Sequence, residues 1–204
     1  MSFPRAAIAL ALVLAADAAV AAVSVATGAT PGVSPHPSLL SPRPVEPEMK
    51  RFAARRRALE RRRAGVPPIR GPIDLGTATN RFGAHRGGHV HGGQDVFAPT
   101  GTPLYAVHDA VVLETGSDGA RGNHIAFYAP RTRRTYAYFH MAEPARVSAG
   151  ERVRAGQRIA AVGCTGSCDG AHLHLEAYAG RGTRGRALDP LPELRRWRRA
   201  AVRT

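Results

Sequence analysis

AHLHLE, at residues 171–176, alternates apolar and polar side chains in the way that a half-buried β-strand does. Side chains two residues apart point to the same face of a strand, so we expect His172 and His174 to share one face and Leu173 and Leu175 to face the core. Two imidazoles roughly 7 Å apart would then look into one cleft. The stretch predicts both a strand and a metal-binding or catalytic site on its polar face.

A second stretch, HGGQD at residues 91–95, contains two more side chains of metal-binding type, His91 and Asp95. On a straight strand these two would share a face but lie roughly 13 Å apart, too far for one ion. Gly92 and Gly93 between them let the backbone bend. We therefore expect both side chains to reach the site that the histidines of AHLHLE face.

Catalytic zinc usually takes three nitrogen or oxygen ligands from the protein and leaves a fourth position for water. His91, Asp95 and one histidine of AHLHLE meet that count. The other histidine of the pair, with His140 in YAYFHM, could orient or deprotonate the water and stabilise the oxyanion. A single strand histidine is more often a surface or core residue, but of the 9 histidines all except His36 fall between positions 85 and 174. This clustering predicts a zinc hydrolase.

The expected secondary structure is almost entirely strand and turn. Glycine-bearing turns separate most of the β-rich runs, which lie at residues 104–116, 124–129, 135–140, 158–163 and 172–179. Short strands at close, regular spacing favour a mainly β fold, in which an antiparallel sheet folds around a groove and holds the metal on its open face.

Further motifs join these two in one long pattern. In chain order they are RFG at 81–83, HGGQD at 91–95, GTPLYAV at 101–107, GN at 122–123, YFHM at 138–141, VSAGERVRAGQRIAAVGCTG at 147–166, HLHLE at 172–176 and DP at 189–190. The pattern resembles the lysostaphin and LytM-like zinc metalloendopeptidases, which cut the peptide cross-bridges of bacterial peptidoglycan. The resemblance covers about residues 70–191, a whole domain.

The resemblance implies one zinc ion, held by His91, Asp95 and His174. It implies His140 and His172 as the catalytic histidines. We expect His172 to be the general base and His140 to hold the oxyanion or the leaving amine, although the two roles could be exchanged. The expected substrate is a peptidoglycan peptide.

The departures from the family pattern are mild. Met141 follows His140 where leucine is usual, and Leu175 replaces phenylalanine on the core face. Both are apolar changes of similar volume, which cores tolerate at modest cost.

Three side chains near the motifs have open roles. His85 and His89 are substitute ligands, substrate contacts or solvated loop residues. Glu176 lies two residues past His174 on the same strand face, so it either supports a ligand from behind or pairs with an arginine.

The chain of 204 residues has distinct segments before and after the domain. Residues 1–22 combine Arg5, an apolar run at 6–16 and AVA at 19–21, which predicts a signal peptide; an uncleaved anchor is the alternative. An exported protein, periplasmic or extracellular at the cell wall, follows from this. Residues 23–50 predict a Pro- and Ala-rich linker, 51–69 a basic segment, and 192–204 a basic tail with a short helix whose Trp197 docks on the domain or stays exposed.

The basic segment permits a helix up to about Ala64, ended by Gly65 and two prolines. The whole chain has 29 basic and 15 acidic residues, a formal charge of +14. We expect the segment to attach to an anionic envelope polymer or membrane surface, the alternative being an ordinary solvated face. Nucleic acid is not an expected partner, because no aromatic side chains interleave with the arginines and the protein is exported.

The two cysteines, Cys164 and Cys168, flank the turn before the AHLHLE strand. Export favours a disulfide between them. Its closed loop is small, so we expect it to stiffen the loop before His172 more than to stabilise the fold. Two free thiols or a separate metal site are the alternatives.

Two other function classes share parts of the pattern. VSAGERVRAG also occurs in lipoyl-type carriers, but such a carrier needs a lysine and the chain's only lysine, Lys50, lies outside the domain. A non-catalytic LytM-like module that binds the wall or activates other hydrolases would have lost ligands or catalytic histidines, and none is lost here. The sequence therefore predicts an active metallopeptidase and leaves open which bond it cuts.

Overall fold

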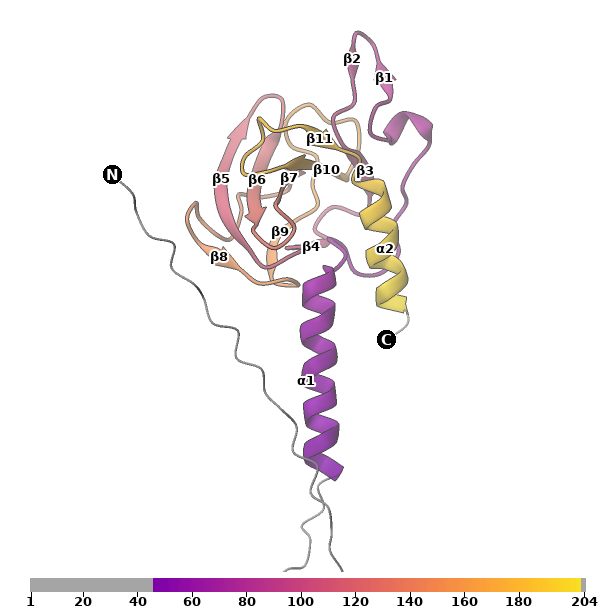
Figure 1. Ribbon diagram of the computed structural model, residues 1–204. Coiled ribbons are helices and arrows are strands. Elements are labelled where there is room, and N and C mark those ends of the chain that lie inside the picture. Colours follow the sequence, from indigo (N-terminus) through magenta and orange to yellow (C-terminus); the bar gives the residue numbers. More distant parts are fainter. Residues whose placement is uncertain (1–45, 203–204) are drawn as a thin grey trace, which may run out of the picture. The chain divides into compact units, whose positions relative to one another are not determined.

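The computed structural model describes residues 46–202. The predicted signal peptide and most of the predicted linker lie outside the described residues. Two α-helices flank a β-rich domain (Figure 1). The elements are α1 (Glu46–Ala64), the 3-10 helix η1 (Ala78–Asn80), β1 (His85–Arg86), β2 (His89–Val90), β3 (Gln94–Phe97), β4 (Pro103–Tyr105), β5 (Ala110–Asp118), β6 (Gly122–Ala129), β7 (Arg134–Met141), β8 (Arg152–Val153), β9 (Arg158–Ala161), β10 (His172–Ala179), β11 (Ala187–Leu188) and α2 (Leu191–Val202).

The main sheet has seven strands in the order β11-β10-β7-β6-β5-β8, and β3 also pairs with β10. All of its pairings are antiparallel. Two smaller sheets join β1 to β2 and β4 to β9. The prediction of a mainly β, antiparallel fold is confirmed.

The main sheet has one face turned to the core and one open face. The core face carries large side chains that are fully buried, namely Ile125 and Phe127 of β6, Tyr136 and Tyr138 of β7, and Leu173 and Leu175 of β10. The tyrosines keep partners for their hydroxyls, since Tyr138 donates to the carbonyl of Tyr105 over 2.9 Å and Tyr136 to Glu193 over 3.0 Å. Alternation then leaves the histidines of β10 on the open face.

The run 104–116, expected as one β-rich stretch, forms two strands, β4 and β5. Its break contains His108, whose ring is 2% exposed and lies 5.6 Å from the ring centroids of both Tyr136 and Trp197. A buried turn at this point brings a polar side chain into the core. Burial lowers the pKa of His108 to about 4.

This buried histidine should make the domain sensitive to acid. The unfolded chain binds a proton at His108 near pH 6.5 and the folded protein only near pH 4, so between these values the unfolded state binds more protons. The free energy of unfolding should be unaffected above pH 6.5 and fall by about 3 kcal/mol as the pH drops to 4. Urea unfolding across this range measures the slope. His108→Leu should make it shallower, and an unchanged slope would contradict the assignment.

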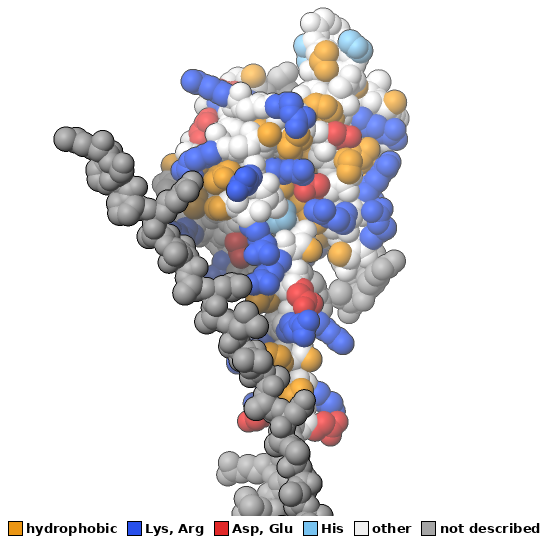
Figure 2. All heavy atoms as spheres, viewed as in Figure 1, with side chains coloured by type: hydrophobic (Ala, Val, Ile, Leu, Met, Phe, Trp, Pro, Cys, Tyr) orange, Lys and Arg blue, Asp and Glu red, His pale blue; other side chains and the backbone are white. Residues whose placement is uncertain are grey.

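Helix α1 begins at Glu46, within the predicted linker, and ends at Ala64 as expected. Glu46 and Glu48 lie in its first turn, where acidic side chains favour a helix. Gly65 then takes a left-handed φ of 88° and ends it. Most of its described charged side chains are basic, and basic side chains also spread over the domain surface in Figure 2. Among residues 46–202, no helix is both long and apolar enough to cross a membrane.

The C-terminal tail forms α2, whose first turn is capped by Asp189 accepting a hydrogen bond from the amide of Leu191 over 2.9 Å. Of the two placements expected for Trp197, the structure shows docking: its ring is 1% exposed, and Nε1 donates to the carbonyl of Ala64 over 3.1 Å. The tail therefore closes the core and holds the end of α1.

Candidate metal centre

Strand β10 lies between β3 and β7, and its pairings assemble the site. The register sets His174 opposite both Asp95 of β3 and Phe139 of β7. Opposed side chains of neighbouring strands share a face with Cβ atoms about 5 Å apart. Phe139 stacks on the His174 ring with centroids 5.3 Å apart and planes inclined by 10°. Leu173 and Leu175 are buried on the other face, as AHLHLE predicted.

The two glycines of HGGQD bring His91 to this face by close packing. Neither Gly92 nor Gly93 has a left-handed φ. A Cβ on Gly93 would lie 2.4 Å from the carbonyl oxygen of Leu175, and one on Gly92 would lie 2.7 Å from Oε1 of Glu176. The missing side chains thus let the segment before β3 lie directly against β10.

Three buried ligand atoms converge here. Nε2 of His91 lies 3.1 Å from Oδ1 of Asp95 and 3.0 Å from Nδ1 of His174, and that Nδ1 lies 2.9 Å from Oδ1 of Asp95. The three residues are 3%, 2% and 8% exposed. The predicted ligands are therefore brought together, as one of two clusters of possible metal ligands in the described chain.

In His91 and His174, the ring nitrogen that faces away from Asp95 has a hydrogen-bond acceptor of its own. Nδ1 of His91 lies 2.8 Å from the carbonyl of Arg81, which can only accept a hydrogen bond. Nε2 of His174 lies 3.2 Å from a carboxylate oxygen of Glu176. With these nitrogens as donors, Nε2 of His91 and Nδ1 of His174 are the ring nitrogens left to face Oδ1 of Asp95, as ligands of one metal ion would.

This donor set fits zinc. Three lone pairs facing one another without a shared proton repel, and a cation between them removes the repulsion. Zinc bonds of about 2.1 Å at tetrahedral angles separate ligand atoms by roughly 3.4 Å, within a few tenths of an ångström of the observed separations. The second cluster, His140, His172 and His174, shares His174, whose only free nitrogen already faces Asp95. The first cluster is the better zinc site.

The second carboxylate oxygen of Asp95 is held by residues that the sequence motifs did not single out. Oδ2 accepts hydrogen bonds from Nη2 of Arg86 and, over 3.4 Å, from Nδ2 of Asn80. Burial alone would raise the pKa of Asp95, but charged hydrogen-bond partners, the guanidinium of Arg86 among them, hold it far below its usual range. Asp95 is therefore a carboxylate at any working pH.

Glu176 supports His174 from behind, the first of the two roles open to it. One oxygen accepts from Nε2 of His174, and the other accepts a hydrogen bond from the hydroxyl of Tyr178. Burial would raise the pKa of Glu176, but the bonds from His174 and Tyr178 lower it. A fixed negative charge at this position orients the imidazole and makes it a stronger ligand.

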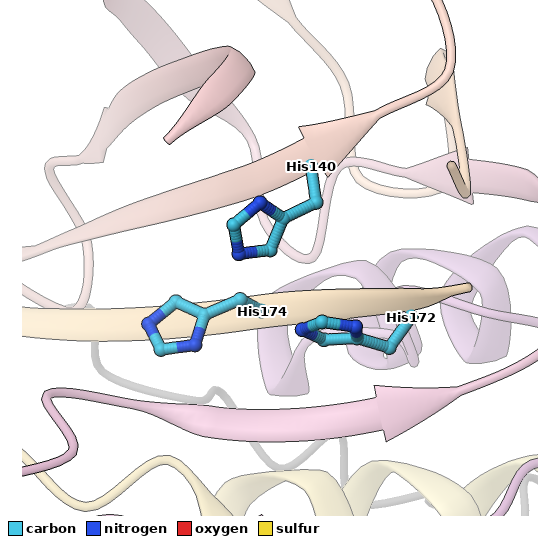
Figure 3. Close-up of side chains that lie close together, drawn as sticks. All are labelled: His140, His172 and His174. Carbon is cyan, nitrogen blue, oxygen red and sulfur yellow. The ribbon is translucent and has the colours of Figure 1, made fainter. Parts of the chain in front are cut away.

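His140 and His172 lie beside His174, one of the three candidate ligands (Figure 3). Main-chain carbonyls orient both of these rings. Nδ1 of His140 donates to the carbonyl of Thr165 over 2.8 Å, and Nδ1 of His172 to that of Gly170 over 2.7 Å. The ring centroids lie 4.9 Å apart, and Nε2 of His172 lies 3.6 Å from Oδ1 of Asp95. With Nδ1 as the donor, Nε2 is the nitrogen that each ring has left to accept a proton.

A β-bulge in β7 turns His140 toward the site. The register between β6 and β7 shifts between Asn123 and Ile125, and His140 takes a left-handed φ of 62°. Such a conformation is uncommon for a residue with a side chain and is found at functional sites. Burial lowers the pKa of His140, so the ring is neutral at neutral pH.

The site opens into a groove of about 360 Å³. Its walls include residues of η1, the loop at 167–170, and the site residues Asp95, His140, His172 and His174. Cys168 of this loop forms a disulfide with Cys164, and the two cysteines are therefore neither free thiols nor a second metal site. His85 and His89 are exposed on the β1–β2 hairpin and belong to neither cluster of ligands among the described residues.

Comparison with known proteins points to one family. Residues 89–190 match the model described as Peptidase family M23. The chain is 35% identical over 114 residues to the peptidoglycan DD-endopeptidase ShyC of Vibrio cholerae, covering 53% of this chain and 26% of that protein. It is 33% identical over 109 residues to the glycyl-glycine endopeptidase ALE-1 of Staphylococcus capitis, covering 53% and 30%. The chain thus spans less than a third of the length of these curated relatives.

Solved structures agree with the sequence comparison. The catalytic domain of the prophage-encoded M23 protein EnpA from Enterococcus faecalis superposes with a TM-score of 0.53 at 30% identity, covering 61% of this chain and 94% of that one. The catalytic domain of lysostaphin from Staphylococcus simulans gives 0.52 at 28% identity, with coverages of 61% and 92%. Both are similar to the β-rich domain described above.

Proposed function

The chain belongs to peptidase family M23, and from this premise we propose that it is a zinc-dependent endopeptidase that hydrolyses the peptide cross-links of bacterial peptidoglycan. One observation supports the chemistry most directly. Three ligand atoms, on His91, Asp95 and His174, meet within 2.9–3.1 Å, and two further imidazoles lie beside them. The names of the relatives support peptidoglycan as the substrate.

In this proposal His91, Asp95 and His174 hold one zinc ion, which when bound lowers the pKa of water toward about 7 and polarises the scissile carbonyl. His172 takes the proton of the attacking water at Nε2. We assign it this role because that nitrogen lies 3.6 Å from Oδ1 of Asp95. The carbonyl of Gly170 keeps its ring in the accepting orientation.

His140 faces the same groove from β7 and takes the second proton-transfer role. His140 is neutral at rest and first accepts at Nε2 the second proton of the attacking water. Because burial lowers its pKa, the protonated ring is a stronger acid than usual and passes this proton to the leaving amine, or shares it with the oxyanion in a hydrogen bond. The fixed hydrogen bond to Thr165 restricts this exchange to Nε2. A non-catalytic wall-binding or activating module is the weaker proposal, because all five of these side chains are present and assembled.

Digestion of purified peptidoglycan with different cross-link types tests the proposal. The zinc-loaded protein should release fragments with new amino and carboxyl termini, whose masses identify the bond that is cut. Protein treated with a chelator should release none until zinc is restored. Intact sacculi after incubation with zinc-loaded protein, for every cross-link type, would refute the proposed activity.

We further propose that the protein is exported and that the basic segment attaches it to an anionic envelope polymer or membrane surface. Arg51, Arg55 and Arg57 are exposed on α1 and have no ion pair with another described residue. Contacts between such charges are screened within roughly 8 Å at physiological salt, so attachment through them should weaken steeply as salt rises.

Changing these three arginines to glutamine should reduce salt-sensitive adsorption to sacculi severalfold and leave cleavage of small soluble wall peptides unchanged. Adsorption against salt concentration and peptide turnover measure the two effects. Arg131, Arg152 and Arg154 are exposed on the domain and provide a control with the same loss of charge. Equal adsorption by the α1 variant and the native protein would show that α1 is no tether.

A further inference from the structure

One loop supplies the acceptors that orient both catalytic histidines. It runs from Cys164 to Gly170, and the disulfide joins its first residue to Cys168. The carbonyl of Thr165 accepts from His140, and that of Gly170 accepts from His172. The two acceptors are five residues apart, and they are held in place in different ways.

The Thr165 half of the loop is fixed without the disulfide. Its hydroxyl donates to the carbonyl of Met141 and accepts from the amide of Asn123, each over 2.8 Å. Gly166 packs so closely on Gly122 that an added Cβ would lie 2.2 Å from the Gly122 nitrogen. The acceptor for His140 is therefore held by the ends of β6 and β7.

The Gly170 half has no comparable support. Within the described chain, residues 168–170 are tied to the rest by the disulfide and by the bond from His172 to Gly170. A Cβ on Gly170 would meet nothing within 4 Å, so the space on that side of the residue is open. Sγ of Cys168 lies 3.7 Å from Nδ1 of His172, which places the disulfide directly against the ring that it helps to hold.

We propose that the Cys164–Cys168 disulfide is a positioning element for His172 and not for His140, an inference that rests on the proposed peptidase function. Without it, Gly170 can move away and Nδ1 of His172 loses its fixed acceptor. The ring then exchanges between two orientations and two tautomers, only one of which turns the Nε2 lone pair to the zinc ligands. The zinc site keeps its own ligands and stays loaded.

The test compares the zinc-loaded native protein with Cys164→Ser/Cys168→Ser. Ring nitrogen NMR shifts, recorded without substrate, report the tautomer of each histidine. We expect His172 to change from a single form with the proton on Nδ1 to a mixture, while His140 and the zinc content stay the same. His140 is an internal control in the same spectrum.

Activity gives a second readout. The double serine variant should lose about 10- to 100-fold in kcat, less than the loss of His172 itself. Adding the serines to His172→Ala should cost little more, because both changes act through one side chain. Mild reduction of the folded native protein should reproduce the loss and should have no effect on the serine variant, which guards against misfolding of that variant.

An unchanged His172 spectrum in both the serine variant and the reduced protein would overturn the inference. A change in His140 as large as that in His172 would also overturn it, because it would show general loosening of the loop. If the native protein cut no peptidoglycan, the peptidase proposal would fail while the spectra still decided the role of the disulfide. If native and variant proteins cut equally well, only the disulfide inference would fail.

Discussion

His174→Ala should lose bound zinc and peptidase activity together. Its Nδ1 is one of three ligand atoms within 2.9–3.1 Å, and two remaining ligands do not make a catalytic zinc site. Since a catalytic metal contributes several kcal/mol to transition-state stabilisation, turnover should fall about 10³-fold or more. Elemental analysis and peptide hydrolysis measure the two losses. Full zinc occupancy in this variant would rule out His174 as a ligand.

Asp95 allows a finer version of the same experiment. Asp95→Ala removes the ligand and also leaves Arg86 without its carboxylate partner, so it changes both metal binding and local packing. Asp95→Asn keeps the shape and removes the charge. We expect the asparagine variant to keep the melting temperature better than the alanine variant, and both to lose zinc. This comparison separates ligand loss from damage to the fold.

His140→Ala and His172→Ala should each cost about 10²- to 10⁴-fold in kcat, the usual contribution of proton transfer, with zinc still bound. Both rings lie beside the ligand cluster, and each presents Nε2 to the groove because Nδ1 is bonded to a carbonyl. His89→Ala is the control, because His89 is exposed on the β1–β2 hairpin. Native turnover by either catalytic variant, or loss of zinc in either, would contradict the assignment.

The sequence predicted the structure best where a local pattern is compatible with only one backbone geometry. The alternation in AHLHLE determined which side chains of β10 face the core, and Leu173 and Leu175 are buried as expected. The spacing in HGGQD left the path from His91 to Asp95 open, because the bend depends on how closely Gly93 packs on β10. That the proposed ligands lie close together could thus be predicted, but the backbone path that brings His91 and Asp95 together could not.

Tertiary contacts explain what the sequence did not predict. The bulge that turns His140 inward depends on the register between β6 and β7, which no motif encodes. Arg86 reaches Asp95 from a separate hairpin. The polar turn at His108 interrupts a β-rich run because two aromatic rings from distant elements enclose it. Each of these features needs partners more than eight residues away along the chain.

The outer edges of the main sheet bear on how the proposed peptide substrate can approach. β3 and β11 both pair with β10, while the two residues of β8 pair with only Ala110 and Val111 of β5. The rest of β5 carries Glu114 and Asp118, both paired with Arg121. Charged side chains on an edge strand oppose the addition of another strand. This part of the β5 edge thus opposes pairing with a further strand, and we expect the proposed peptide substrate to enter through the groove over the open face instead.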